Sequence, residues 1–204
     1  MMRQDPQMRL LPSLATSWKP IDPNTWEFKL RQGVKFHNGT PFTARDVVFS
    51  IERAPKVPNA PATYRRRVAQ VESAKAVDDH TVHIRTKAPT PLLPENLAQL
   101  PIVSETVGMD AEPAQFNDGS KAFGTGPYRF NTFARGDRIT FTANPNWWGG
   151  KPKWDNVTFR WITSAPARTA ALLSGDVDVI ASVSTTDVAK LEDDPRVNVS
   201  ATAS

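Results

Sequence analysis

Alternating apolar and polar residues mark two candidate strands near the N-terminus. Residues 25–30 (TWEFKL) alternate apolar and polar side chains, the period-2 pattern of a half-buried strand. After Gly33 the alternation resumes over residues 34–36 and stops at Asn38-Gly39, a dipeptide suited to a backbone with positive φ. The pattern predicts a hairpin-like unit that ends in a tight turn.

A helix start signal follows this unit. Thr43 fits the N-cap and Asp46 the N3 position of a capping box, while Phe42 and Val47 occupy the two positions of a hydrophobic staple. Apolar residues then recur at helical spacing within residues 44–54, where a following proline ends the segment. We expect this helix to pack on the preceding hairpin-like unit.

The middle of the chain repeats the strand period and then loses it. Residues 68–77 and 81–86 read as a second hairpin joined across Asp78-Asp79. The stretch beyond it is punctuated by prolines, and its apolar run at residues 92–103 fits a short helix and loop, with an ambiguous period.

The last third of the chain combines strands with helices. The expected elements are antiparallel strands around 128–130, 139–141 and 157–161, a helix over 165–174 closed by Gly175, a short strand over 177–180 and a capped helix over 184–192. Alternation of strand and helix at the end of the chain predicts an α/β part.

Composition agrees with a mixed fold dominated by sheet. The 204 residues are 39% hydrophobic and 23% charged, with 18 prolines against 10 glycines, which is typical of a folded chain rich in strands and structured loops. There is no cysteine, so disulfides, thiolate metal sites and a cysteine nucleophile are excluded. No stretch approaches the roughly 18 apolar residues of a membrane-spanning helix. Because the start has no apolar signal region, we expect an export signal to have been removed or to lie upstream.

Charge and motifs offer little support for nucleic-acid binding or catalysis. The net charge of +4 comes from scattered bases, with one tight cluster at residues 65–67. His80 and His83 are three apart in a predicted strand and point to opposite faces, which disfavours a shared metal. We therefore expect no nucleic acid, metal or cofactor. The enzyme alternative is a hydrolase with a dispersed site, since no common catalytic motif is present.

Two motifs in the second half have both structural and ligand-binding interpretations. In Gly124-Thr125-Gly126-Pro127, glycines and a proline fix a tight backbone, which can simply start a strand or can line a cleft close to a ligand. The Trp147-Trp148 pair, next to a turn, is interpreted mainly as an anchor of that turn, with ligand stacking as the alternative.

The order of these motifs resembles one known family. Residues 14–18 (LATSW) and 26–50 (WEFKLRQGVKFHNGTPFTARDVVFS) are similar to the signature of the family 5 extracytoplasmic solute-binding proteins, the dipeptide, oligopeptide and nickel type. The resemblance continues through residues 124–128, 144–150 and 171–179 in the family's order and covers essentially the whole chain. The upstream segment and the second lobe of the family have no counterpart here.

The resemblance implies one lobe of a type II periplasmic-binding-protein clamshell, in which largely antiparallel sheets carry flanking helices and two lobes close on a solute. It implies that residues 1–20 and 155–204 form the hinge-proximal α/β subdomain of the first lobe and residues 21–154 an inserted β-rich subdomain, with the second lobe absent. The implied function is capture of peptides or similar small solutes for a membrane permease of an ABC importer. The implied location is the periplasm or the outer surface of a bacterial membrane.

A ligand-binding wall is expected on this lobe, without a catalytic role. The candidate ligand-binding residues are Thr125, Gly126, Pro127, Tyr128, Leu97 and Leu100. We expect the isolated lobe to bind ligand weakly or not at all, and its uncovered cleft face could self-associate. Nickel complexes, oligosaccharides or another small solute remain alternative ligands, and a β-rich structural or adhesive domain remains the alternative of another class.

Overall fold

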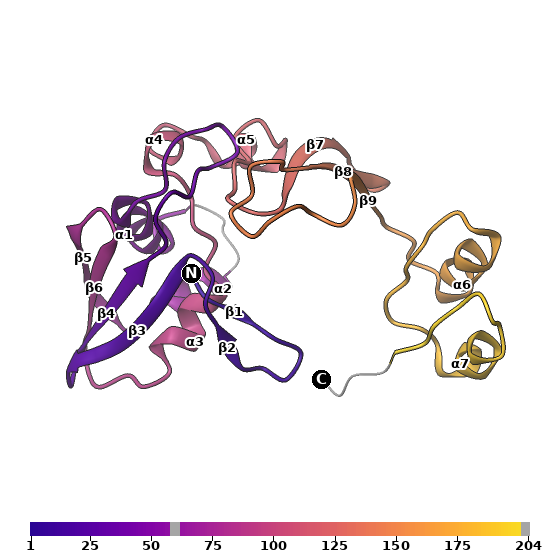
Figure 1. Cartoon of the computed structure of the whole chain (residues 1–204), viewed down its shortest axis with the longest axis horizontal. Helices are drawn as coiled ribbons and strands as arrows, with labels where there is room; N and C mark the ends of the chain where they lie inside the picture. Colours follow the sequence, from indigo (N-terminus) through magenta and orange to yellow (C-terminus); the bar gives the residue numbers. More distant parts are fainter. Residues whose placement is uncertain (58–61, 201–204) are drawn as a thin grey trace. The chain divides into compact units, whose positions relative to one another are not determined.

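A computed structural model describes residues 1–57 and 62–200 (Figure 1). It shows a mixed α/β chain that divides into two compact units. Unit 1 comprises Met1–Phe133 and Thr140–Val157, and unit 2 comprises Ala134–Ile139 and Thr158–Ser204. Residues 1–20 belong to unit 1, and their predicted grouping with residues 155–204 in one subdomain stays a prediction.

Unit 1 is built on a four-stranded antiparallel sheet in the order β3-β4-β6-β5. The strands are β3 (Ala15–Asp22), β4 (Thr25–Leu30), β5 (Val71–Asp78) and β6 (Thr81–Thr86). Phe28 pairs with Val82 across β4 and β6, and both side chains are buried, as the alternation predicts for one face. The predicted strand at residues 25–30 and the second hairpin are confirmed, although β5 begins at Val71.

The hairpin-like unit predicted for residues 25–36 is wrong in its pairing. Both edges of β4 are occupied, by β3 on one side and β6 on the other, so residues 34–36 cannot join it. Gly33 has φ +73° and turns the chain away, and Lys35 makes only a single bridge with Pro41. The apolar residues Val34 and Phe36 are nevertheless buried in the core.

Helix α1 (Ala44–Arg53) begins where the capping signal predicts. The Asp46 carboxylate accepts a hydrogen bond from the Thr43 backbone N–H at 2.7 Å, as expected of an N3 acid. The strand contacts of α1 are mainly with β5 and to a lesser extent with β6. Helix α1 lies mainly against the hairpin that follows it in the sequence (Figure 1), and it shares one hydrophobic core with Phe28 and Phe36 of the preceding unit, so the expected packing is only part of its contacts.

Unit 1 also contains several short elements. They are β1 (Arg3–Gln4), β2 (Leu10–Leu11), α2 (Ala62–Arg67), α3 (Leu93–Ala98), α4 (Glu105–Gly108) and α5 (Pro113–Asn117). Helix α3 confirms the short helix expected within residues 92–103. It contributes Leu93 and Leu97 to the same hydrophobic core as Phe28.

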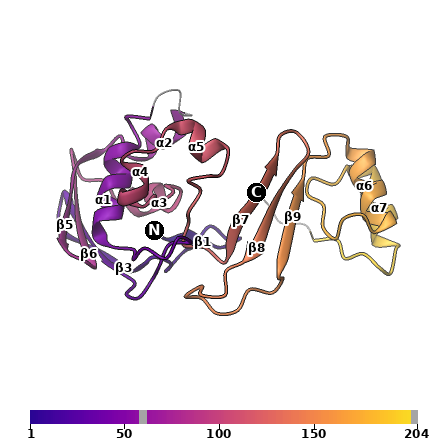
Figure 2. The same ribbon diagram turned by 90° about the horizontal axis from the view of Figure 1, so that it is seen from above.

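A three-stranded sheet confirms the strand set predicted around residues 128–161. Its strands β7 (Tyr128–Ala134), β8 (Arg138–Ala143) and β9 (Asn156–Arg160) follow one another in space as in sequence (Figure 2). Gly136 has φ +76° in the turn between β7 and β8, a conformation that other residues rarely adopt.

Unit 2 carries two helices, α6 (Ala165–Ser174) and α7 (Thr185–Glu192), so both predicted helices are confirmed, although the Ser184 side chain does not cap the backbone of α7. The Ser164 hydroxyl accepts from the Ala167 N–H at 3.4 Å, and Gly175 ends α6 with φ +80°. The strand predicted at residues 177–180 is not formed. A strand needs a hydrogen-bonded neighbour, and none pairs with this segment among the described residues.

Candidate functional site

The Gly124–Tyr128 segment lies between α5 and the start of β7, within unit 1. All five of its residues are half-buried, so the loop is anchored in the protein and still reaches the surface. It contains four of the six residues predicted to bind ligand: Thr125, Gly126, Pro127 and Tyr128.

One side of this loop is held by His37. The His37 backbone N–H donates to the Gly124 carbonyl at 2.8 Å, and the Gly124 N–H donates to His37 Nδ1 at 3.2 Å. His37 Nε2 lies 3.1 Å from the Gly126 carbonyl oxygen. Because Nδ1 accepts a proton donor, the neutral ring carries its hydrogen on Nε2, which donates to Gly126.

The other side is held by Asn144, a residue only 3% exposed. Its Nδ2 donates to the Gly126 carbonyl at 3.1 Å, and its backbone N–H donates to the Pro127 carbonyl at 2.7 Å. Its Oδ1 accepts from the Arg129 guanidinium at 2.9 and 3.2 Å. Both the oxygen and the nitrogen of the buried amide are hydrogen-bonded, as is usual for a buried polar group.

These contacts leave a defined set of backbone groups open. The carbonyls of Gly124, Gly126 and Pro127 are all engaged within the chain. Within the described part of the chain, no hydrogen bond is made by the backbone N–H groups of Thr125 and Gly126, or by the Thr125 carbonyl. A methyl group on Gly126 would meet no atom within 4 Å, so another molecule has room to approach the backbone there.

Electrostatics at the loop favour a neutral His37. Burial of the ring lowers the pKa of His37, the Gly126 contact opposes this, and the positive charge of Arg129 lowers the pKa further. No carboxylate takes part in the contacts described for this loop, so the arrangement offers backbone amides, neutral side chains and the Arg129 cation.

The remaining predicted site residues lie in different surroundings. Tyr128 is half-buried, and its hydroxyl accepts from the Trp154 N–H at 3.3 Å. Leu97 is 0% and Leu100 4% exposed, and both belong to the hydrophobic core. A packing role accounts for the two leucines, so they are not brought together with the loop as ligand contacts.

Sequence reasoning missed His37 and Asn144 as partners of the loop. Both stand in motifs that read as turns, at His37-Asn38-Gly39 and Asn144-Pro145-Asn146. The contacts span 89 and 18 residues, so no local signal could reveal them.

The tryptophan pair packs as a turn anchor. The two rings lie 5.4 Å apart, and the Arg31 guanidinium sits 4.3 Å above the Trp148 ring. A side chain at Gly149 would collide with the Trp147 ring, since an added Cβ would lie 2.5 Å from it. This close approach fits the interpretation as a structural turn.

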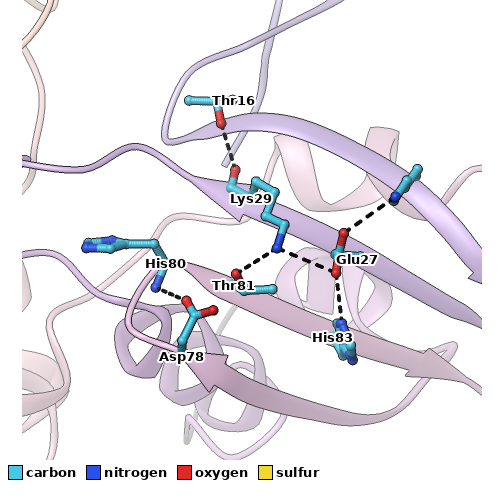
Figure 3. A network of polar contacts seen from close by, with 8 residues as sticks. Thr16, Glu27, Lys29, Asp78, His80, Thr81 and His83 are labelled. Carbon is cyan, nitrogen blue, oxygen red and sulfur yellow. Dashed lines mark hydrogen bonds and ion pairs between the residues drawn. The ribbon is translucent and has the colours of Figure 1, made fainter.

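Figure 3 shows a polar network around Glu27 on the main sheet, which includes His83, and beside it a separate contact of His80 in the turn between β5 and β6. Glu27 contacts His83 Nε2 at 3.2 Å, Lys29 at 3.7 Å and Lys19 at 3.9 Å. The His80 backbone N–H donates to Asp78. Among residues 1–57 and 62–200, no three histidine, aspartate or glutamate side chains are placed to hold a metal ion.

Unit 1 thus combines a β-rich core with a loop that His37 and Asn144 anchor and whose Thr125 and Gly126 backbone N–H groups are open. Residues 9–204 match the family model of bacterial extracellular solute-binding proteins, family 5. The chain belongs to this family.

Curated relatives agree with the family. A 182-residue match is 32% identical to protein XP55 of Streptomyces lividans and covers 87% of this chain and 33% of that protein. A 212-residue match is 30% identical to di/tripeptide-binding protein 2 of Pseudomonas aeruginosa and covers 93% of this chain and 40% of that protein. The chain thus spans only about 30% to 40% of the length of the curated relatives it matches.

Solved structures show the same fold. NikZ from Campylobacter jejuni, in complex with Ni(L-His), is 26% identical with a TM-score of 0.85, over 95% of this chain and 39% of that one. The oligopeptide-binding protein AppA from Bacillus subtilis, in complex with a nonapeptide, is 27% identical with a TM-score of 0.83, over 94% of this chain and 39% of that one. No helix in the described residues is both long and apolar enough to cross a membrane.

Proposed function

We propose that this chain supplies one wall of the binding site of an ABC-importer solute-binding protein that captures peptides. The observation that carries the proposal is the loop at Thr125 and Gly126, where two successive backbone N–H groups and one carbonyl are open while the neighbouring carbonyls are locked. Such a row of main-chain groups suits the backbone of an extended peptide, because pairing with it is independent of the peptide's side chains.

Peptides are favoured over the other solutes by two lines of support. The Pseudomonas relative is named as a di/tripeptide-binding protein, and AppA was solved with a nonapeptide. NikZ carries a nickel complex, so the family accepts other ligands, and nickel complexes or oligosaccharides are the competing outcomes of a binding test.

The proposal extends to the setting of the protein. It is a bacterial protein of the periplasm, or an extracellular protein associated with the membrane; it hands its ligand to a membrane permease and catalyses no reaction. Residues 1–20 and 155–204 form the part of this lobe nearest the hinge, and residues 21–154 the inserted subdomain. A single wall makes few contacts, so we expect the 204-residue chain alone to bind peptides weakly.

The test is a calorimetric titration of di- and oligopeptides into the complete product of the gene that encodes this chain. Gly126→Ala adds a methyl group where the chain itself leaves room, so folding should be unchanged while affinity falls by about tenfold, or about 1.4 kcal/mol. Ser73→Ala, at an exposed position of β5, is the matched control. Heat from a nickel complex or a sugar and none from peptides would overturn the peptide assignment.

A further inference from the structure

We propose that His37 is a positioning residue that makes the ligand-facing conformation of the 124–126 loop depend on a neutral imidazole. The open groups that a ligand would use, on Thr125 and Gly126, lie between the two points that the His37 ring holds. We call the two bonds between the His37 ring and the backbone of Gly124 and Gly126 the clamp. The clamp is a property of the free protein, so only its effect on ligand affinity rests on the proposed function.

The two ring nitrogens of His37 have opposite roles in the clamp. Nδ1 accepts from the Gly124 N–H at 3.2 Å, and Nε2 donates to the Gly126 carbonyl at 3.1 Å. A protonated ring carries a hydrogen on both nitrogens and can accept nothing. Protonation would therefore bring two N–H donors face to face and remove the bond between the ring and the Gly124 N–H, while the bond from the His37 backbone N–H to the Gly124 carbonyl remains.

The second half of the loop is held independently of pH. Asn144 binds the Gly126 and Pro127 carbonyls through an amide that does not titrate. The change on acidification is therefore confined to the Gly124 side, next to the open N–H and carbonyl of Thr125.

The surroundings of the ring place its titration on the acid side. Arg129, on β7, is the charged group whose field acts on His37, and its guanidinium is bound to the neutral Oδ1 of Asn144. The other partners of the ring, at Gly124 and Gly126, are uncharged backbone groups. The clamp is thus closed above the ordinary histidine range and opens as pH falls through the lowered pKa of His37.

The first experiment follows the ring nitrogens of His37 and the amide of Gly124 by ¹⁵N NMR between pH 8 and pH 4.5. We expect the Nε2–H tautomer at pH 8, a midpoint below about 6.5, and a Gly124 amide shift with the same midpoint. An Nδ1–H tautomer, or a Gly124 amide that ignores the titration, would overturn the proposal. His37→Gln should remove the pH-dependent shift of Gly124, whereas His80→Gln should leave it intact.

The second experiment measures peptide affinity of the complete gene product at pH 7.5 and pH 5. Loss of one hydrogen bond in the loop predicts that the peptide affinity at pH 5 is about tenfold lower than at pH 7.5. In His37→Gln this difference between the two pH values should disappear. Equal pH dependence in wild type and His37→Gln would refute the positioning role. If peptides do not bind at pH 7.5, the proposed function fails, and the NMR measurement still decides whether the clamp exists.

Discussion

The two units of this chain reach their folds by different means. Of the hydrophobic residues whose burial the structure describes, the fully buried ones all belong to unit 1 except Leu191, and the four strands and α1 of that unit share one core. In unit 2, Phe159 is 65% and Val179 79% exposed, so its elements share little apolar burial. Helices α6 and α7 form there because the hydrogen bonds of a helix are local, and α6 has its own caps at both ends, whereas the strand predicted at residues 177–180 needs a distant partner and is not formed.

Two phenylalanine substitutions, one in each unit, test the difference in apolar burial between the units most strongly. Phe28→Ala removes a fully buried ring from β4 and should lower the free energy of unfolding by about 3–5 kcal/mol. Phe159→Ala removes a ring that is mostly in water and should cost far less. Urea denaturation followed by circular dichroism measures both, and equal losses would contradict the contrast between the units.

A second pair of substitutions compares the aspartates that organise helices in the two units. Asp46 accepts backbone N–H bonds from Thr43 at 2.7 Å and from Glu105 at 2.8 Å, so Asp46→Ala should cost about 1–3 kcal/mol. Asp187 accepts one hydroxyl bond from Thr169, and Asp187→Ala should cost less. Thermal unfolding of the two variants gives the order, and a larger effect of Asp187→Ala would reverse it.

The smallest effect is expected at the half-buried network around Glu27. The hydrogen bond from His83, more than the charges of Lys29 and Lys19, lowers the pKa of the Glu27 carboxyl. A carboxyl with a lowered folded-state pKa stabilises the fold above its unfolded pKa, and this contribution disappears as pH falls through the folded value. Carboxyl-carbon NMR should show a midpoint that rises in His83→Gln, and an unchanged midpoint would remove His83 as the cause.

Local sequence patterns were enough to predict much of the fold. The strand at residues 25–30, the capped start of α1 and both helices of unit 2 depend on near neighbours, and each was predictable. The pairing of β4 with β3 and β6, and the choice of β5 as the main support of α1, depend on contacts far apart in sequence. The alternation at residues 34–36 predicted burial correctly and strand pairing wrongly, because an apolar period reports a buried face and not a partner.

In the candidate site, too, the features set by near neighbours were predictable and those set by distant contacts were not. Glycines and proline at residues 124–127 marked a tight backbone, but their sequence could not show which carbonyls were already engaged. His37 and Asn144 supply those bonds from distant segments. Leu97 and Leu100 are the opposite case: the sequence analysis named them as ligand contacts, whereas apolar residues near a predicted loop are more often core than ligand contacts.

The most direct test of the account is a crystal structure of the complete gene product with a bound peptide. We predict a main-chain oxygen of the peptide within about 3 Å of the amide nitrogen of Thr125 or Gly126. His37 and Asn144 should keep their bonds to the loop in that complex. A peptide bound without any contact to residues 124–128 would contradict the account.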